Sequence, residues 1–334
     1  MLRLLHGTSY DFIGKWKITT AVTLAFIVPG LILIAVAGYN YSIEFTGGTA
    51  MQLSFKTPPV AAEIRATIDA AGVRGSEITQ FGADTAYLVR VQDPRQIAEQ
   101  SRGAESVADR IDTALAKKYG AGTYKVVRTE AVGPKVGGEL RQRAFYAILF
   151  SFLVTLMYLA WRFEWRFGVA AVIATAHDIL ATLAFIKYAN LEVSLVVVGG
   201  ILTMIGYSLN DTIIIFDRVR ENLHKHKREP LYDTLNRSVN ETLPRSILTH
   251  ATVLATLIAL TILGGEVLRP FALVMVFGVI TGTFSSIFVA SPILLWIENK
   301  YPRAVGDRGG VGVKPVRQMD MHHAPSPKAS PVVH

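Results

Sequence analysis

The sequence has no cysteine and few charged residues. The absence of cysteine from all 334 residues excludes disulfide bonds, thiolate zinc sites and a cysteine nucleophile. Charged residues make up 18% of the chain, against about 25% in ordinary soluble proteins, whereas hydrophobic residues make up 51%. A soluble chain of this length does not need so apolar a composition to bury a core. The chain is therefore predicted to be a membrane protein.

Sequence patterns for enzymatic chemistry or cofactor binding are also missing. Gly47-Gly48 is not followed by the Gly-Lys-Ser/Thr of a phosphate-binding loop, and the glycine spacing of a dinucleotide-binding fold does not occur. There is no Ser-His-Asp or His-Glu-x-x-His pattern, and His322-His323 has no third metal ligand at helical or hairpin spacing. The net charge of +8 is not arranged in basic runs interleaved with aromatic residues. We expect no enzymatic activity, cofactor, metal site or nucleic-acid binding.

Six apolar stretches are each long enough to cross a bilayer. A helix rises about 1.5 Å per residue and needs about 20 residues to span about 30 Å of hydrocarbon. The stretches are 18–38, 144–161, 167–186, 193–216, 246–265 and 271–297. Lys and Arg gather before the first stretch and after the second and fourth, and the positive-inside rule assigns these segments to the cytoplasm. The sequence predicts a multi-pass membrane protein with both termini in the cytoplasm.

The segment 39–141 is the one long polar stretch between two spans. The first apolar stretch is longer than the apolar region of a cleavable signal, about 7–15 residues, so we expect it to anchor an exported segment. Alternating apolar residues predict strands at 51–55, 77–81, 86–92 and 123–129, and apolar repeats at helical spacing predict helices at 64–71 and 107–119. The order βαββαβ predicts a ferredoxin-like α+β domain, a sheet with helices on one face.

The predicted fold class is a polytopic α-helical membrane protein with six transmembrane helices and one exported ferredoxin-like domain. Residues 1–38 form the cytoplasmic N-terminus and the first transmembrane helix, and residues 39–141 form the exported domain. Residues 142–300 form a bundle of five transmembrane helices. Pro and Gly recur from 301 to 334 while the apolar signal stops, which predicts a disordered cytoplasmic tail.

Asp211 lies inside the fourth apolar stretch, with Tyr207 and Asn210 as candidate polar helpers just before it. A charge near the bilayer centre costs about 2.5–3.5 kcal/mol on insertion scales. The residue is either a buried polar group that holds helices together or a carboxyl group that binds and releases protons. We favour the proton site, with Arg245 at the start of the fifth stretch as its partner, because a guanidinium stabilises the ionised carboxylate and is released when the carboxylate is protonated.

Two further polar clusters lie in or beside the spans. His177-Asp178 occupies the middle of the third stretch, and consecutive side chains on a helix point about 100° apart, so each can bond a different neighbour. For Asp178 we favour a structural role that orients the bundle. The second cluster follows the fourth stretch at the membrane surface and is either a solvated helix face or an interface for a partner. It comprises Asp217, Arg218, Arg220 and Glu221.

Six short motifs follow one another between about residue 15 and residue 300. They are Phe45-Thr46-Gly47-Gly48-Thr49, Val132-Gly133-Pro134-Lys135-Val136-Gly137, His177-Asp178, Gly206-Tyr207-Ser208-Leu209-Asn210-Asp211, Asp217-Arg218-Val219-Arg220-Glu221-Asn222 and Gly282-Thr283-Phe284-Ser285-Ser286. In this order and spacing they resemble the SecF family, the smaller half of the bacterial SecDF translocase subunit. The fourth and fifth motifs are specific to that family.

The resemblance implies a member of the resistance-nodulation-division superfamily in the bacterial cytoplasmic (inner) membrane. In that family proton flow moves an exported domain and helps to pull unfolded secretory preproteins out of the SecYEG channel. The implied partners are SecD, SecYEG, a YidC-type insertase, the preprotein and membrane lipid, and the implied coupling ion is the proton. Asp211 is similar to the family's proton-relay aspartate and Arg245 to the arginine of its Arg-Ser/Thr-x-x-Thr motif. The remaining relay aspartate belongs to SecD.

Two positions depart from the family pattern. Glu44 stands where the family usually has Asp before Phe-Thr-Gly-Gly, and it keeps the negative charge. His250 stands where a Ser commonly follows Thr249. His250 either tunes the proton relay or only packs between helices, and both interpretations remain open.

Two other functions also remain open. The first is a proton-driven exporter of lipids or small molecules, for which one exported domain of about 100 residues is small. The second is a scaffold that only holds other translocon subunits in place. The scaffold hypothesis predicts that Asp211→Asn has no effect, whereas substitutions around Arg218 and Arg220 do.

Overall fold

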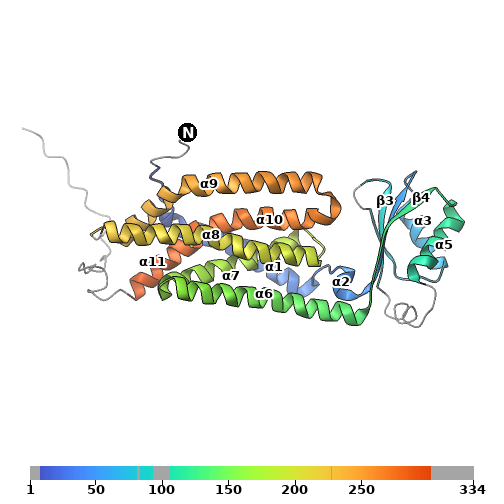
Figure 1. The fold of residues 1–334 in the computed structure, drawn as a ribbon, viewed down its shortest axis with the longest axis horizontal. Helices are drawn as coiled ribbons and strands as arrows, with labels where there is room; N and C mark the ends of the chain where they lie inside the picture. The colour runs from blue at the N-terminus through green and yellow to red at the C-terminus, as the bar shows by residue number, and fades with distance from the viewer. Residues whose placement is uncertain (1–7, 81–82, 93–105, 227, 302–334) are drawn as a thin grey trace, which may run out of the picture.

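The computed structural model describes residues 8–80, 83–92, 106–226 and 228–301, and it has two parts. Figure 1 shows an elongated bundle of long helices with a small α/β domain at one end. We call the end of the bundle beside this domain the domain end and the opposite end the far end. The predicted tail, including His322-His323, lies outside the described residues beyond Tyr301.

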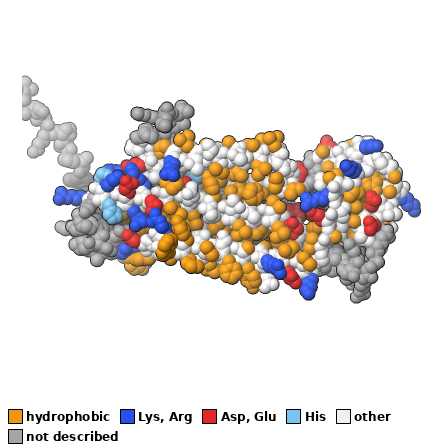
Figure 2. Space-filling model, in the orientation of Figure 1, with side chains coloured by type: hydrophobic (Ala, Val, Ile, Leu, Met, Phe, Trp, Pro, Cys, Tyr) orange, Lys and Arg blue, Asp and Glu red, His pale blue; other side chains and the backbone are white. Residues whose placement is uncertain are grey.

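Six helices of the bundle are long and apolar enough to cross a membrane, as predicted. They are α1 (Trp16–Ala37), α6 (Pro134–Arg162), α7 (Trp165–Tyr188), α8 (Leu195–Lys225), α9 (Leu231–Leu263), and α10 (Gly265–Ser285) with its continuation through a π-helical turn (Ser286–Ala290) into α11 (Ser291–Lys300). A short 3₁₀ helix, η1 (Ile13–Lys15), precedes α1. Figure 2 shows charged side chains gathered at the two ends of the bundle, with hydrophobic and uncharged side chains between them.

Several helices are longer than the apolar stretches that predicted them. Helix α8 continues past 216 to Lys225, and α9 begins at Leu231 rather than near 246. Helix α6 begins at Pro134, within the segment that the sequence assigned to the exported domain. Backbone hydrogen bonds continue a helix whether or not its side chains are apolar. An apolar stretch therefore predicts which part of a helix can lie in lipid, but it does not predict where the helix begins and ends.

The small domain consists of β1 (Gly48–Phe55), α3 (Ala61–Ala70), β2 (Glu77–Gln80), β3 (Ala86–Val91), α5 (Val107–Tyr119) and β4 (Tyr124–Val132). The element order βαββαβ agrees with the prediction. The strand order is β2-β3-β1-β4, and all neighbouring strands are antiparallel. Helix α3 connects β1 to β2, with β3 between them in the sheet, and α5 connects β3 to β4, with β1 between them. Leu53, Val89, Ile68 and Ile111 are fully buried in one cluster, which places both helices on the same face of the sheet.

The small domain is attached to the domain end of the bundle by polar contacts as well as by its two linkers. Arg90 on β3 forms an ion pair with Glu192 in the loop between α7 and α8. Burial raises the pKa of Glu192, and the neighbouring Arg90 guanidinium opposes this shift. The Glu44 carboxylate in the short helix α2 (Ile43–Thr46) accepts a hydrogen bond of 2.6 Å from the backbone N–H of Leu195, the first residue of α8. The linker after α1 is thereby held against the start of α8.

Helix α1 packs on α7 through a contact between small residues. A Cβ atom at Gly30 would lie 2.4 Å from Cβ of Ala184, and Gly30 and Ile27 are the buried residues of α1. We expect Gly30→Leu to lower the free energy of unfolding by about 1–3 kcal/mol, because overpacking separates the two helices. Thermal unfolding in detergent measures this. Gly138→Leu is the matched control, since nothing lies within 4 Å of a Cβ there; an equal loss in both variants would contradict the assigned contact.

Candidate functional site

Asp211 is buried in the bundle, with 2% of its surface exposed. Its partners come from α9: Nε2 of His250 lies 3.2 Å from Asp211 Oδ2, and the Ser246 hydroxyl donates to Oδ1 at 3.4 Å. Ser246 and His250 are four residues apart, so they project from the same face of α9. The α8–α9 contact thus holds a carboxyl group between an imidazole and a hydroxyl.

Among the described residues, Asp211 and Arg245 do not form the predicted ion pair, and Asp211 faces His250 instead. Arg245 is exposed on α9, whereas the next residue, Ser246, is buried against Asp211. One residue rotates a helix by about 100°, so the two side chains cannot point toward the same neighbour. Thr249 and Thr252 follow Arg245 on the exposed side of α9, and Asn210 is exposed on α8. This chain therefore presents an outward-facing polar surface beside its buried carboxyl group.

His250 connects Asp211 to α10. Its Nδ1 lies 2.9 Å from the Thr283 hydroxyl, and Thr283 donates its single proton to the carbonyl of Val279 at 2.9 Å. With the Thr283 proton on the Val279 carbonyl, the matching tautomer of His250 donates from Nδ1–H to Thr283 and turns Nε2 toward Asp211. For a hydrogen bond at this contact, either a neutral imidazole faces a protonated carboxyl group or an imidazolium faces a carboxylate. In both arrangements the Asp211–His250 pair holds one proton between its two members.

Tyr207 packs beside this pair. Its ring meets the His250 ring edge to face with the centroids 5.6 Å apart. Its hydroxyl is buried and has no hydrogen-bond partner among the described residues. The sequence placed Tyr207 among the polar helpers, and the structure brings it to His250.

Asp178 forms a second polar centre, bonded to α8 through Ser208, three residues before Asp211. It is fully buried, and its carboxylate accepts hydrogen bonds from the hydroxyls of Ser208 on α8 and Ser285 on α10, the latter at 2.6 Å. The adjacent His177 places Nδ1 2.9 Å from the same carboxylate. Asp178 therefore ties α7, α8 and α10 together. Among the described residues no cluster of three or more His, Asp and Glu side chains suits a metal ion.

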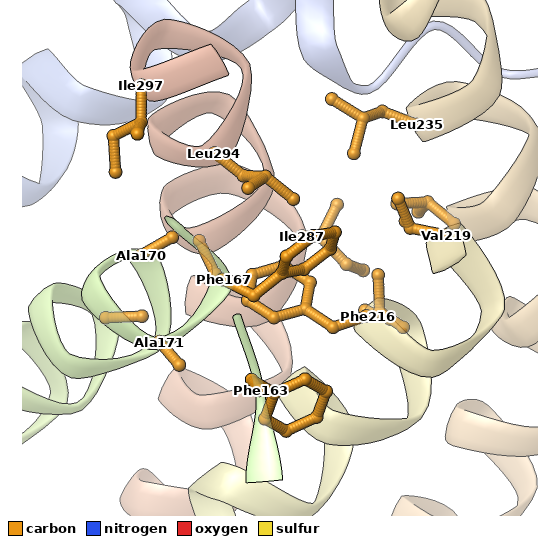
Figure 3. Packing of buried hydrophobic residues seen from close by; sticks show 14 of the residues in the cluster. Phe163, Phe167, Ala170, Ala171, Phe216, Val219, Leu235, Ile287, Leu294 and Ile297 are labelled. Carbon is orange, nitrogen blue, oxygen red and sulfur yellow. The ribbon is translucent and has the colours of Figure 1, made fainter. Parts of the chain in front are cut away.

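An aromatic cluster lies between these polar centres and the far end. Figure 3 shows Phe163, Phe167 and Phe216 packed together beside Ile287 and Leu294. The Phe167 and Phe216 rings meet edge to face with the centroids 5.3 Å apart. This buried apolar layer lies next to the charged surface at the far end, where Phe163 directly follows Arg162.

The charged run at the end of α8 bonds largely within the chain. Asp217 accepts hydrogen bonds of 2.9 and 3.0 Å from Arg162 of α6, and Arg220 lies 3.7 Å from the same carboxylate. Arg218 donates at 2.6 Å to both Glu241 of α9 and Glu221. These half-exposed ion pairs link three helices, and a partner interface at this surface stays a prediction.

Comparison with known proteins connects the chain to protein export. Residues 112–300 match the family model of the C-terminal part of the protein export membrane proteins SecD/SecF, and residues 32–59 match the SecD/SecF GG motif. The protein translocase subunit SecF of Gemmatimonas aurantiaca is 60% identical over 305 residues, which cover 91% of each chain. The SecF subunit of Desulfurispirillum indicum is 44% identical over 284 residues, covering 84% of this chain and 89% of its own.

Two solved structures share the fold. The crystal structure of SecDF from Thermus thermophilus, described as a translocon-associated membrane protein, matches 90% of this chain with a TM-score of 0.78 and 33% identity. SecDF in a super-membrane-facing form matches 88% with a TM-score of 0.64 and 35% identity. The chain spans only 40% and 39% of the length of these two proteins.

Proposed function

Because the chain belongs to the SecD/SecF family of protein-export membrane proteins, we propose that it acts as the SecF subunit of a SecDF-type complex and uses the proton motive force to promote preprotein export. Its partners are then SecD, the SecYEG channel, the unfolded preprotein and, in the same membrane, a YidC-type insertase. Lys15, Arg162 and Arg166 lie at the ends of α1, α6 and α7 that form the far end, so the positive-inside rule assigns the far end to the cytoplasm and the small domain to the opposite side. The coupling ion is the proton.

The observation that carries this proposal is the buried Asp211–His250 pair. A group that stores one proton between two helices changes the α8–α9 contact when the proton is gained or lost. A proton that descends about 100 mV releases about 2.3 kcal/mol, similar to the few kcal/mol that separate two packings of a helical bundle. One or two protons per cycle therefore suffice to move α8 against α9.

The outward position of Arg245 gives it a role between subunits. A guanidinium at the membrane-embedded level of Asp211 is costly unless it faces a carboxylate or water. The resemblance to the family assigns one relay aspartate to SecD, and Arg245 on α9 and Asn210 on α8 are exposed and open to contact by a partner subunit. Protons then pass between the Asp211–His250 pair of this chain and an aspartate paired with Arg245 across the interface.

Translocation of a secretory preprotein into inverted membrane vesicles at fixed ATP tests the proposed function. The vesicles contain SecYEG and SecD, with or without this chain, and the rate is measured with and without a proton gradient. We expect the stimulation by the gradient to require the chain, while the ATP-driven rate does not. Equal stimulation in vesicles that lack the chain would exclude the proposal.

Substitutions at His250 separate proton sharing from packing. His250→Phe keeps a ring beside Tyr207 but cannot share a proton, so we expect the gradient-dependent rate to fall about tenfold, as for the loss of one charge-assisted hydrogen bond. His250→Ser places a hydroxyl beside Asp211, leaves room for a water molecule and should retain most of the rate. The same vesicle assay measures both variants. An unchanged rate in His250→Phe would show that His250 only packs.

A further inference from the structure

Helix α6 buries little of its surface, and a cleft lies beside it at the domain end. Only 6% of its apolar segment is buried, a share similar to that of α1 (11%) and α9 (17%) and well below that of α7 (50%) and α8 (56%). A cleft of about 700 Å³ lies between α6, α7, α8 and the linker after α1. This volume falls within the range of about 300–1,000 Å³ that is typical of ligand-binding clefts. Its walls include Phe45, Ala144, Ile148, Leu183 and Val198.

Two tyrosines at the cleft indicate the depth at which a bilayer meets water. Tyr39 and Tyr41, which follow α1, line the cleft, and their rings stand edge to face with the centroids 6.0 Å apart. The Tyr39 hydroxyl donates to the carbonyl of Leu183 at 3.2 Å. Tyrosine is enriched at membrane interfaces because an apolar ring and a polar hydroxyl suit the boundary. The apolar walls therefore continue from this boundary into the hydrocarbon region.

Arg141 supplies a positive charge at the cleft. It lines the cleft together with Gln142, and among the described residues it forms no ion pair. Arg143, two residues later on α6, lies 3.9 Å from the Glu139 carboxylate instead. An unpaired guanidinium beside an apolar cleft matches an amphiphile with an anionic head and an apolar tail.

We propose that the cleft binds one phospholipid, with its phosphate on Arg141 and an acyl chain along Ala144 and Ile148 of α6. The surrounding bilayer supplies such a molecule, and the apolar walls offer water few partners. A peptide would bring backbone N–H and C=O groups that these walls could not satisfy. The bound lipid fills the space between α6 and the rest of the bundle. This inference does not depend on the proposed proton site.

Native mass spectrometry of the complex between this chain and SecD tests the inference. The complex is reconstituted in nanodiscs of phosphatidylethanolamine and phosphatidylglycerol, released into mild detergent, and the retained phospholipids are counted. We expect Arg141→Gln to lower retention of one phospholipid about tenfold, as for the loss of one charge-assisted contact. Arg143→Gln, whose charge is already paired, is the matched control and should retain the lipid.

A second variant tests the acyl-chain contact. Ala144→Phe fills the cleft while leaving Arg141 in place, and we expect it to abolish retention of that phospholipid. Retention in both variants equal to that of the native complex would overturn the inference. It would also be overturned if the isolated chain retained one phospholipid and the native complex none, because the partner would then cover the cleft. Export activity enters neither readout.

Discussion

Asp211→Asn is expected to abolish the gradient-dependent part of preprotein translocation and to leave the ATP-driven part intact. Asparagine has nearly the same size as aspartate and can still bond to Ser246, so the α8–α9 packing is preserved. It cannot bind or release a proton, and the Asp211–His250 pair then has one protonation state fewer. The vesicle assay at fixed ATP, with and without a gradient, measures both parts of the rate.

Asp217→Asn is the matched control for this experiment. It is the same substitution on the same helix, at a half-exposed carboxylate bound to Arg162 near the far end. We expect it to retain the gradient-dependent part, because a surface ion pair contributes about 0–1 kcal/mol. If Asp211→Asn retains both parts of the rate, the carboxyl group is structural and the scaffold hypothesis takes first place. If cells without the chain accumulate a lipid or small molecule instead of preproteins, the exporter hypothesis gains support.

Asp178→Leu is expected to reduce the folded yield and to lower the free energy of unfolding by about 3–5 kcal/mol, the cost of breaking a buried polar network. Leucine removes the acceptor of the buried Ser208 hydroxyl and leaves the Ser285 hydroxyl only the carbonyl of Gly282. Helices α7, α8 and α10 then lose the carboxylate that connects them by hydrogen bonds. Thermal unfolding of the purified chain in detergent measures the loss.

Asp178→Asn separates the structural role from proton transfer. The amide oxygen can still accept from Ser208 or Ser285, so we expect a smaller loss of stability. Gradient-dependent export should then fall only in proportion to the amount of folded protein. A fully folded Asp178→Asn chain without gradient-dependent export would instead identify a second proton site in the third span.

The sequence locates Asp211, whereas it predicts Arg245 as the partner and leaves the role of His250 open; helix geometry explains why. A carboxylate in an apolar stretch can be recognised from the sequence alone. Placing it in lipid costs free energy, so it usually has a functional role. Whether Arg245 or Ser246 faces it depends on the rotation of α9 about its axis, which packing against α8 and α10 decides. The i, i+4 spacing of Ser246 and His250 was visible, yet equal spacings occur throughout the helix.

Contacts between distant segments set the remaining limit of the prediction. His250 meets Thr283 across 33 residues, and Asp178 meets Ser285 across 107. Hydroxyl groups are common in apolar helices, so Thr283 and Ser285 carried no signal of their own beyond the motif that contains them. The order of strands and helices in the small domain was predictable, because alternation in strands and apolar repeats in helices are local properties.

The hydrogen bond between the backbone N–H of Leu195 and Glu44 connects helix α8 to the segment that leads into the small domain. Leu195 and Asp211 lie on one continuous helix, about 24 Å apart at 1.5 Å per residue. A tilt of about 5° around Asp211 displaces the Glu44 anchor by about 2 Å over that length. Glu44 lies just before β1, the first strand of the small domain. Arg90 forms an ion pair with Glu192 in the loop that leads into α8. Under the proposed function, a change of packing around Asp211 would therefore reach the small domain through one stiff helix.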